Sequence, residues 1–288
     1  MAAPVKQAMP QYQSRDNEVV DYELFELPGF PYMLRGPQPA PGKEYVSVVG
    51  AGQSFGVLVR NPYTHQLHAE LGTEIFNLSV GGSAPTLYLR NPEALEVCNN
   101  SKVCIVQVLS ARSTVSSYFE SDGGKNMLRP QGSKLPFVPG DTAFTMMFQS
   151  EPSMVSRLVV KEIQSNWVKE MSTLLRSITV PKILLWFSKR KPEQLRSEFK
   201  NYREASGVFP QFVNREMIDE IVPFADAYVE VASNRGSPQP LTSRFTGEPV
   251  TVLLGDGGRP SGENSYYPSP EMHDDAFNAL KETLHAFL

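Results

Sequence analysis

The sequence predicts a three-layer α/β domain built on a mostly parallel sheet of about five strands. Two observations support this fold class. Short apolar segments rich in Val, Ile and Leu alternate with segments whose apolar residues recur at helical spacing, an order typical of parallel strands joined by helices. Small-residue turns follow the first two apolar segments, as expected where strands end at the ligand crevice of an open sheet.

The composition is that of an ordinary globular chain. With 288 residues, 41% hydrophobic and 20% charged, it can build one large core. A formal net charge of -4 gives no general attraction to nucleic acid or to an anionic membrane, and we expect neither as a partner. The chain shows neither a bilayer-spanning apolar run nor a secretory signal, so we expect a cytoplasmic protein.

The cysteines and two of the histidines do not form a metal-binding pattern. Cys98 and Cys104 lack metal-ligand spacing, and we interpret them as reduced core thiols. His65 and His68 lie three apart on an expected helix, but no third ligand is suitably spaced. We therefore expect no metal site.

The chain divides into an arm and one domain. Residues 1–44 are polar at first and then rich in proline and glycine, which predicts an irregular N-terminal arm. Residues 45–288 form the α/β domain. Its first strand is Tyr45–Val49, which is rich in Val and followed at once by glycine. Asn61 and Pro62 are typical of a helix start.

The remaining elements follow from the same periodicities. Residues 110–140 are polar, rich in glycine and too long for a plain connector, so we expect a functional or mobile loop there. The further expected strands are residues 74–80, 102–109, 182–187 and 227–231, and the further expected helices are residues 84–97, 151–178, 217–224 and 269–288.

The turn after the first strand has features of a cofactor site and of a catalytic site. Gly50, Gly52 and Gly56 give a G-x-G-x-x-x-G pattern close to a dinucleotide loop. The acidic residue that would hold a ribose after the second strand is absent, so we expect no such cofactor. Ser54 favours a different chemistry, because a serine on a tight turn can act as a nucleophile beside backbone N–H groups that stabilise an oxyanion.

Two blocks of the sequence resemble those of a known family. GAGQSFG followed by NLSVGGS is similar to the first two sequence blocks of the SGNH (GDSL-like) hydrolases. The resemblance implies a flavodoxin-like or SGNH-like fold with Ser54 as the nucleophile. It also implies an oxyanion hole made by the N–H groups of Ser54 and Gly82, with Gln53 as a neighbouring substrate contact.

The last two blocks depart from that pattern. Arg112 stands where the family has the asparagine of Gly-x-Asn. The family's Asp-x-x-His aligns with a segment that begins at Asn264 and ends at Tyr267, and the nearest histidine is His273. On this resemblance we expect His273 and Tyr267 to be acid/base partners and Asn264 to be a substrate contact.

Arg112 also indicates an anion site. With Ser110 before it and several hydroxyl residues after it, Arg112 is suited to bind a sulfate, phosphate or carboxylate. Lys189 and Arg190 follow the fourth strand at the same edge and would add positive charge. The alternative is a solvated basic loop, with Arg112 paired to an internal carboxylate.

Three functions remain open. The leading one is an esterase or acyltransferase that acts on an acyl-type group of a polar, carbohydrate-like small-molecule substrate. The second is a group-transfer enzyme with an anionic donor, either a sulfotransferase with a nucleotide-type donor or a coenzyme A-dependent enzyme; no other cofactor is expected. The third is a catalytically silent carbohydrate-binding protein. The sequence leaves open whether the protein is a homo-oligomer.

Overall fold

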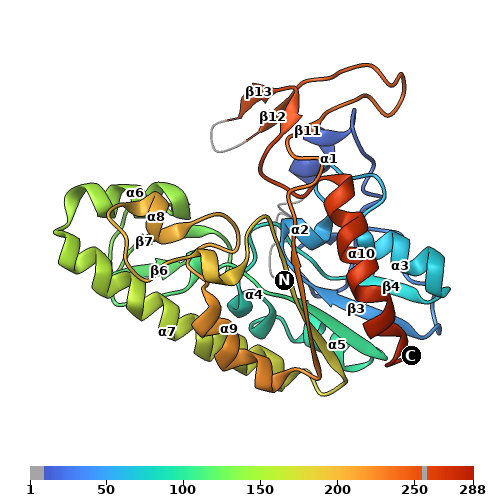
Figure 1. Cartoon of the computed structure of the whole chain (residues 1–288), viewed down its shortest axis with the longest axis horizontal. Coiled ribbons are helices and arrows are strands. Elements are labelled where there is room, and N and C mark those ends of the chain that lie inside the picture. The colour runs from blue at the N-terminus through green and yellow to red at the C-terminus, as the bar shows by residue number, and fades with distance from the viewer. Residues whose placement is uncertain (1–9, 255–257) are drawn as a thin grey trace, which may run out of the picture.

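A five-stranded parallel sheet forms the centre of the protein (Figure 1). The computed structural model describes residues 10–254 and 258–288. The strands lie in the order β10-β9-β5-β3-β4, and all neighbouring pairs are parallel. Their bounds are Tyr45–Val49 (β3), Glu74–Asn77 (β4), Val103–Gln107 (β5), Lys182–Ser188 (β9) and Ala227–Ala232 (β10). The predicted fold class is confirmed.

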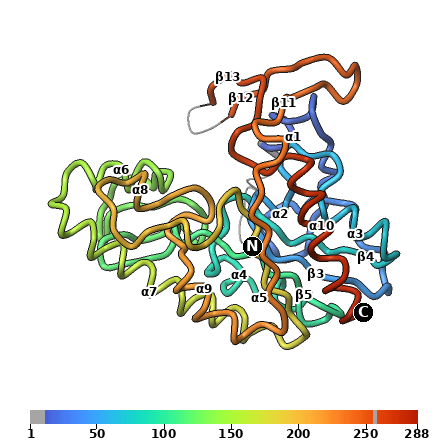
Figure 2. Tube along the Cα trace, viewed as in Figure 1, coloured from blue at the N-terminus to red at the C-terminus, as the bar shows by residue number. Residues whose placement is uncertain are grey.

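Helices cover both faces of this sheet, which gives three layers. Within β5, Val103 and Ile105 pack into the apolar cluster on one face, whereas Cys104 and Val106 pack into the cluster on the other. Both faces are thus buried, which explains the continuous apolar runs of the sequence. On one face α3 (Tyr63–Leu71) and α10 (Pro270–His285) lie side by side, and on the other lie α4 (Pro85–Leu89), α5 (Pro92–Asn99), α7 (Ser153–Ser177) and α9 (Arg215–Ile221) (Figure 2).

The expected long loop at residues 110–140 contains secondary structure of its own. Phe119 and Leu128 are buried there, and the Phe119 ring lies 5.0 Å from that of Phe144. This apolar contact packs a small antiparallel sheet against α6, so the segment expected to be a functional or mobile loop has secondary structure of its own. The elements are η1 (Ala111–Ser113), β6 (Phe119–Ser121), β7 (Met127–Pro130) and β8 (Val138–Pro139), followed by α6 (Gly140–Ser150); α8 (Tyr202–Ser206) packs on α6.

The N-terminal segment is mostly irregular but packs into the core. Tyr22 and Leu34 are fully buried. The buried Arg35 guanidinium donates hydrogen bonds to the carbonyls of Phe55 and Gly56, at 3.0 and 2.6 Å. The arm therefore supports the turn after β3 and is not loosely attached. Its elements are α1 (Pro10–Asp16), β1 (Phe25–Glu26) and β2 (Met33–Leu34).

Two short antiparallel strand pairs precede the last helix and lie near α1 (Figure 1). They pair β11 (Gln239–Pro240) with β14 (Glu263–Asn264), and β12 (Val252–Leu254) with β13 (Arg259–Ser261). The remaining elements are α2 (Gly52–Phe55), η2 (Pro192–Gln194) and η3 (Val222–Phe224). None of the helices in the described ranges has both the length and the apolar character that a bilayer crossing requires.

Candidate ligand cleft

A cleft of about 860 Å³ opens at the carboxyl ends of the central strands. Gly52 after β3, Gly82 after β4, Arg112 after β5 and Lys189 after β9 all line it. Tyr267, between β14 and α10, lines it as well. This is the position at which open α/β sheets bind their ligands.

The cleft brings together most of the predicted site residues, but not all of them. Ser54, Arg190 and His273 are not among the residues that line it. Those that do line it are Gln53, Gly82, Ser110, Arg112, Lys189, Asn264 and Tyr267.

Ser54 is fully buried and lies on the side of α2 that faces the core. Its hydroxyl accepts a hydrogen bond from Tyr63 at 2.8 Å, and its backbone N–H donates to Gln107 Oε1 at 3.3 Å. Neither group is available to a ligand in the cleft. The interpretation of Ser54 as an exposed nucleophile and oxyanion donor does not agree with this position.

His273 is also fully buried, beneath the cleft. Its ring lies 5.8 Å from that of Tyr63 and 5.1 Å from that of Phe187. Nδ1 accepts a hydrogen bond from the Tyr63 backbone N–H at 3.2 Å, and burial lowers the pKa of His273 to about 3. The imidazole is therefore neutral and structural. Met272, the preceding residue, is the one that lines the cleft.

Lys189 and Arg190 are adjacent but point to different surroundings. The buried Arg190 guanidinium donates to the carbonyls of Pro210 and Val213, and burial lowers the pKa of Arg190 to about 10. Lys189 Nζ donates to Ser237 Oγ at 2.7 Å and to a backbone carbonyl, and burial lowers its pKa. No carboxylate of the described residues pairs with Lys189. Only Lys189 of the two contributes a cation to the cleft.

Tyr267 occupies the space above Gly52. A Cβ atom on Gly52 would lie 2.7 Å from Tyr267 Cε1, closer than real contacts allow. Asn264 Oδ1 accepts hydrogen bonds from the N–H groups of Tyr266 and Tyr267, at 3.1 and 2.9 Å, and so fixes the turn. Burial raises the pKa of Tyr267 well above its ordinary value, so its phenol stays protonated.

Arg112 pairs with a carboxylate inside the cleft wall. Its guanidinium forms an ion pair with Asp141, whose other oxygen accepts a hydrogen bond from the Tyr202 hydroxyl. Burial lowers the pKa of Arg112, but the nearby Tyr266 and Asp141 outweigh this effect and the pKa is raised overall. Arg112 is therefore an orientated, permanently charged donor and not a free cation.

The lining is strongly basic in a chain whose net charge is -4. Asp141 is the sole acidic side chain among the described lining residues. Cations gathered in a concave, partly buried site favour an anion there. The basic lining residues are Arg15, Arg112, Lys125, Lys189 and Arg203.

Three of the residues that line this space have unpartnered backbone donors. The N–H groups of Gly52, Gln53 and Gly82 have no hydrogen-bond partner in residues 10–254 and 258–288. Gly82 has a φ of 76°, a conformation that favours glycine. The role of Gly82 as a backbone donor stays a prediction. Gln53, predicted as a substrate contact, offers its backbone N–H group for the same role.

A protein-family model assigns the family. The sequence matches the model of a family described as a domain of unknown function (DUF6473) over residues 9–126 and 145–288. The chain belongs to this family. None of the curated proteins matches the sequence.

Solved structures similar to this DUF6473 chain include hydrolases at low sequence identity. Phospholipase A1 from Streptomyces albidoflavus has 9% identity and a TM-score of 0.45, covering 86% of this chain and 100% of its own. A family 2 carbohydrate esterase with a carbohydrate-binding domain, from Corynascus thermopiles, has 11% identity and a TM-score of 0.41, covering 89% and 69%. A protein from Slackia heliotrinireducens described as an SGNH hydrolase has 12% identity and a TM-score of 0.39, covering 84% and 100%. These likenesses concern the fold.

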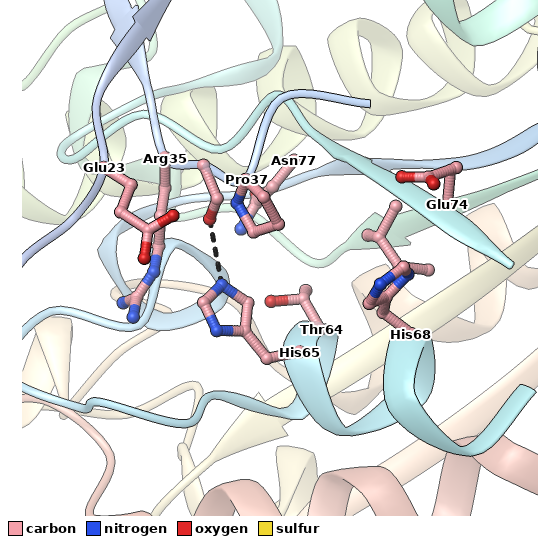
Figure 3. A pocket seen from close by; sticks show the side chains of 10 residues that line it. Glu23, Arg35, Pro37, Thr64, His65, His68, Glu74 and Asn77 are labelled. Carbon is pink, nitrogen blue, oxygen red and sulfur yellow. Dashed lines mark hydrogen bonds between the residues drawn. The ribbon is translucent and has the colours of Figure 1, made fainter. Parts of the chain in front are cut away.

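The DUF6473 structure has a second, smaller pocket of about 240 Å³ between α3 and the N-terminal arm (Figure 3). His65 and His68 lie there, away from the cleft lining. His65 Nε2 is 2.9 Å from the Gly36 carbonyl oxygen, and burial lowers the pKa of His65 to about 4. Across the described ranges, no group of three or more His, Cys, Asp or Glu side chains is arranged to hold a metal ion.

Several lining residues were missed by sequence reasoning. Asp141 and Asn126 lie in or next to the segment expected to be a loop, whose length and polarity were the available signal. Tyr266 was adjacent to a predicted residue. Gln211 and Tyr12 carried no signal, because one lies in an irregular connection and the other in the arm.

Proposed function

We propose that the cleft binds a polar, carbohydrate-like ligand that carries an anionic group, and that it does so without Ser54 as a nucleophile. The observation that carries this proposal is the charge of the lining: five basic side chains line the cleft, and although Arg15 is paired with Asp16 and Arg112 with Asp141, the other three have no ion-pair partner among the described residues. A cleft of this kind concentrates anions and orientates them through charge-assisted hydrogen bonds.

Lys189 is the best candidate for the charge contact. The Lys189 side chain is half-buried and has no carboxylate partner among the described residues. Desolvation lowers its pKa, so an anionic ligand would supply the missing counter-charge. The rest of the lining suits a ring with apolar faces and polar edges. The aromatic side chains of Tyr266, Phe187 and Phe209 stand beside the polar groups, a mixture typical of small-molecule sites.

Serine hydrolysis through Ser54 lacks both of its requirements. A nucleophile must face the ligand, and a base must lie within hydrogen-bond reach of it. Ser54 and His273 are both fully buried below the cleft. No histidine or cysteine is found among the described residues that line the cleft.

A second candidate is an esterase or acyltransferase that uses a different nucleophile. It is favoured by the unpartnered N–H groups of Gly52, Gln53 and Gly82, which are suited to bind the oxygen of an acyl group. A group-transfer enzyme would use the same backbone donors, and the basic lining would bind the phosphates of coenzyme A or of a nucleotide sulfate donor.

Thermal-shift measurements separate these functions. The charged saccharide probes are tetragalacturonate, a hyaluronan tetrasaccharide and a chondroitin sulfate tetrasaccharide. Cellotetraose is the neutral control. Coenzyme A and adenosine 3′,5′-bisphosphate serve as donor analogues. We expect a charged saccharide to raise Tm and cellotetraose not to do so. A ligand at a hundredfold excess over its Kd stabilises by about 2.7 kcal/mol.

Variants connect the effect to the cleft. Lys189→Met should lose most of the stabilisation, whereas Lys191→Met, at an exposed lysine outside the lining, should keep it. If no charged saccharide stabilises the protein, the proposed function is wrong. Stabilisation by coenzyme A or the bisphosphate alone would favour the group-transfer function. Labelling by a fluorophosphonate that disappears in Ser54→Ala would restore serine hydrolysis.

A further inference from the structure

One wall of the cleft contains polar atoms that have no partner. Arg112 Nε, Asn126 Oδ1 and Gln211 Oε1 are shielded from solvent and make no hydrogen bond with the described residues. Arg112 is 9% exposed and Gln211 is 4% exposed, and all three residues line the cleft. Buried polar groups are nearly always paired, so three unpaired atoms in one wall call for an explanation.

The three side chains belong to one cluster. The Ala111 backbone N–H donates to the Gln211 carbonyl at 3.0 Å, which places Gln211 beside the segment that carries Arg112. Asn126 Oδ1 and Arg112 Cγ both lie against Gly140. The ion pair with Asp141 fixes the Arg112 guanidinium.

Tyr266 covers part of this wall. Its hydroxyl accepts a hydrogen bond from Gln211 Nε2 at 3.4 Å, which is too long to be strong, and its phenol lies close enough to Arg112 to affect the pKa of the guanidinium. Tyr266 is 45% exposed. Asn264 holds the backbone of the turn that carries Tyr266, and the Tyr266 ring lies 4.9 Å from that of Tyr267.

We propose that Arg112, Asn126 and Gln211 form a subsite for two adjacent free hydroxyl groups of a sugar ring, and that the Tyr266 side chain turns away as the ring enters. Two of the unpartnered atoms are acceptors and one is a donor, so the ligand must supply two donors and one acceptor. A pair of hydroxyls does this. A sulfate, phosphate or ionised carboxylate has no donor and cannot satisfy Asn126 and Gln211.

This inference rests on the proposed function and divides the cleft into two parts. Lys189 takes the anionic group of the saccharide, and the wall of Arg112, Asn126 and Gln211 takes its hydroxyls. The ligand is therefore a charged saccharide with unmodified neighbouring hydroxyls. A free inorganic anion satisfies only the Lys189 part.

The test uses the full chain and the charged tetrasaccharide that stabilises it most, measured by calorimetric titration. The comparison probe is the same tetrasaccharide with every hydroxyl O-methylated, which keeps the carboxylate or sulfate groups but loses the hydroxyl donors. We expect the parent protein to bind the unmodified saccharide about tenfold more tightly, as one retained hydrogen bond to a buried acceptor implies.

Gln211→Met removes the unpartnered acceptor with little change in side-chain size. We expect it to bind the unmodified saccharide about tenfold more weakly, to lose the preference over the methylated form, and to unfold at the same or a higher temperature. Gln131→Met, which removes an amide whose Nε2 is hydrogen-bonded to the Ser116 carbonyl at 2.9 Å outside the lining, should keep the affinity and the preference.

The outcomes separate this inference from the proposed function. If Gln211→Met binds like the parent while Lys189→Met still weakens binding, the subsite is wrong and the proposed function stands. If Gln211→Met lowers the unfolding temperature and keeps the preference for free hydroxyls, the residue is structural and the subsite is wrong. If no charged saccharide binds, the proposed function fails and the subsite fails with it.

Discussion

Ser54→Ala distinguishes a structural serine from a nucleophile. In the structure, the Tyr63 hydroxyl donates to Ser54 Oγ at 2.8 Å, and both side chains are fully buried. Removing the Ser54 hydroxyl leaves the Tyr63 hydroxyl without its acceptor and without access to water. An unsatisfied buried group of this kind costs about 1–3 kcal/mol. We expect Ser54→Ala to lower the free energy of unfolding by that amount.

A double-mutant cycle with Tyr63→Phe isolates the hydrogen bond. The phenylalanine removes the orphaned hydroxyl, so the double variant should be more stable than the sum of the two single losses predicts, by about 0.5–3 kcal/mol. The assay is denaturant unfolding, with saccharide affinity measured in parallel and expected to stay within about twofold, since Ser54 does not line the cleft. A Ser54→Ala variant as stable as the parent but unable to turn over an ester would refute this reasoning.

Two further predictions concern the floor of the cleft. Gly52→Ala places a Cβ atom 2.7 Å from the Tyr267 ring, so it should lower the free energy of unfolding by about 1–3 kcal/mol. The loss should be smaller when Tyr267 is replaced by Ala, which denaturant unfolding of the single and double variants measures. Equal losses in the two backgrounds would contradict this prediction. Because the pKa of His273 is about 3 when folded and near 6.5 when unfolded, the unfolded chain binds the extra proton and stability should fall as pH falls through that window. His273→Asn should make this fall shallower in unfolding curves recorded from pH 7 to pH 4, and an unchanged slope would show that other groups cause it.

The sequence was sufficient for the central sheet. Parallel strands buried on both faces give continuous apolar runs, and all five were located this way. The small sheet of β6, β7 and β8 was not found, because it is built on sparse apolar residues such as Phe119, which pack only once Phe144 on α6 is in place.

The cleft residues were predicted where strand ends alone determine position. Gln53, Gly82, Arg112 and Lys189 follow strands, and all four line the cleft. The pattern does not determine the direction in which a side chain points. On the single turn of α2, neighbouring residues point about 100° apart, so Gln53 faces the cleft and Ser54 faces the core.

The same limitation applies at two other positions. On α10, Met272 reaches the cleft and His273 packs against Tyr63. After β9, Lys189 faces the cleft, whereas Arg190 turns inward to backbone carbonyls. A sequence pattern locates such a turn, but only tertiary packing decides which of two adjacent side chains faces the ligand.

The most direct test of the account is a calorimetric titration of the full chain with a charged tetrasaccharide and with its neutral counterpart, in which carboxylates are reduced and any sulfates removed. The cleft described here predicts at least about tenfold tighter binding of the charged form, an advantage that decreases with salt and is lost in Lys189→Met. Equal affinity for the two forms, or a charge preference that survives in Lys189→Met, would contradict it.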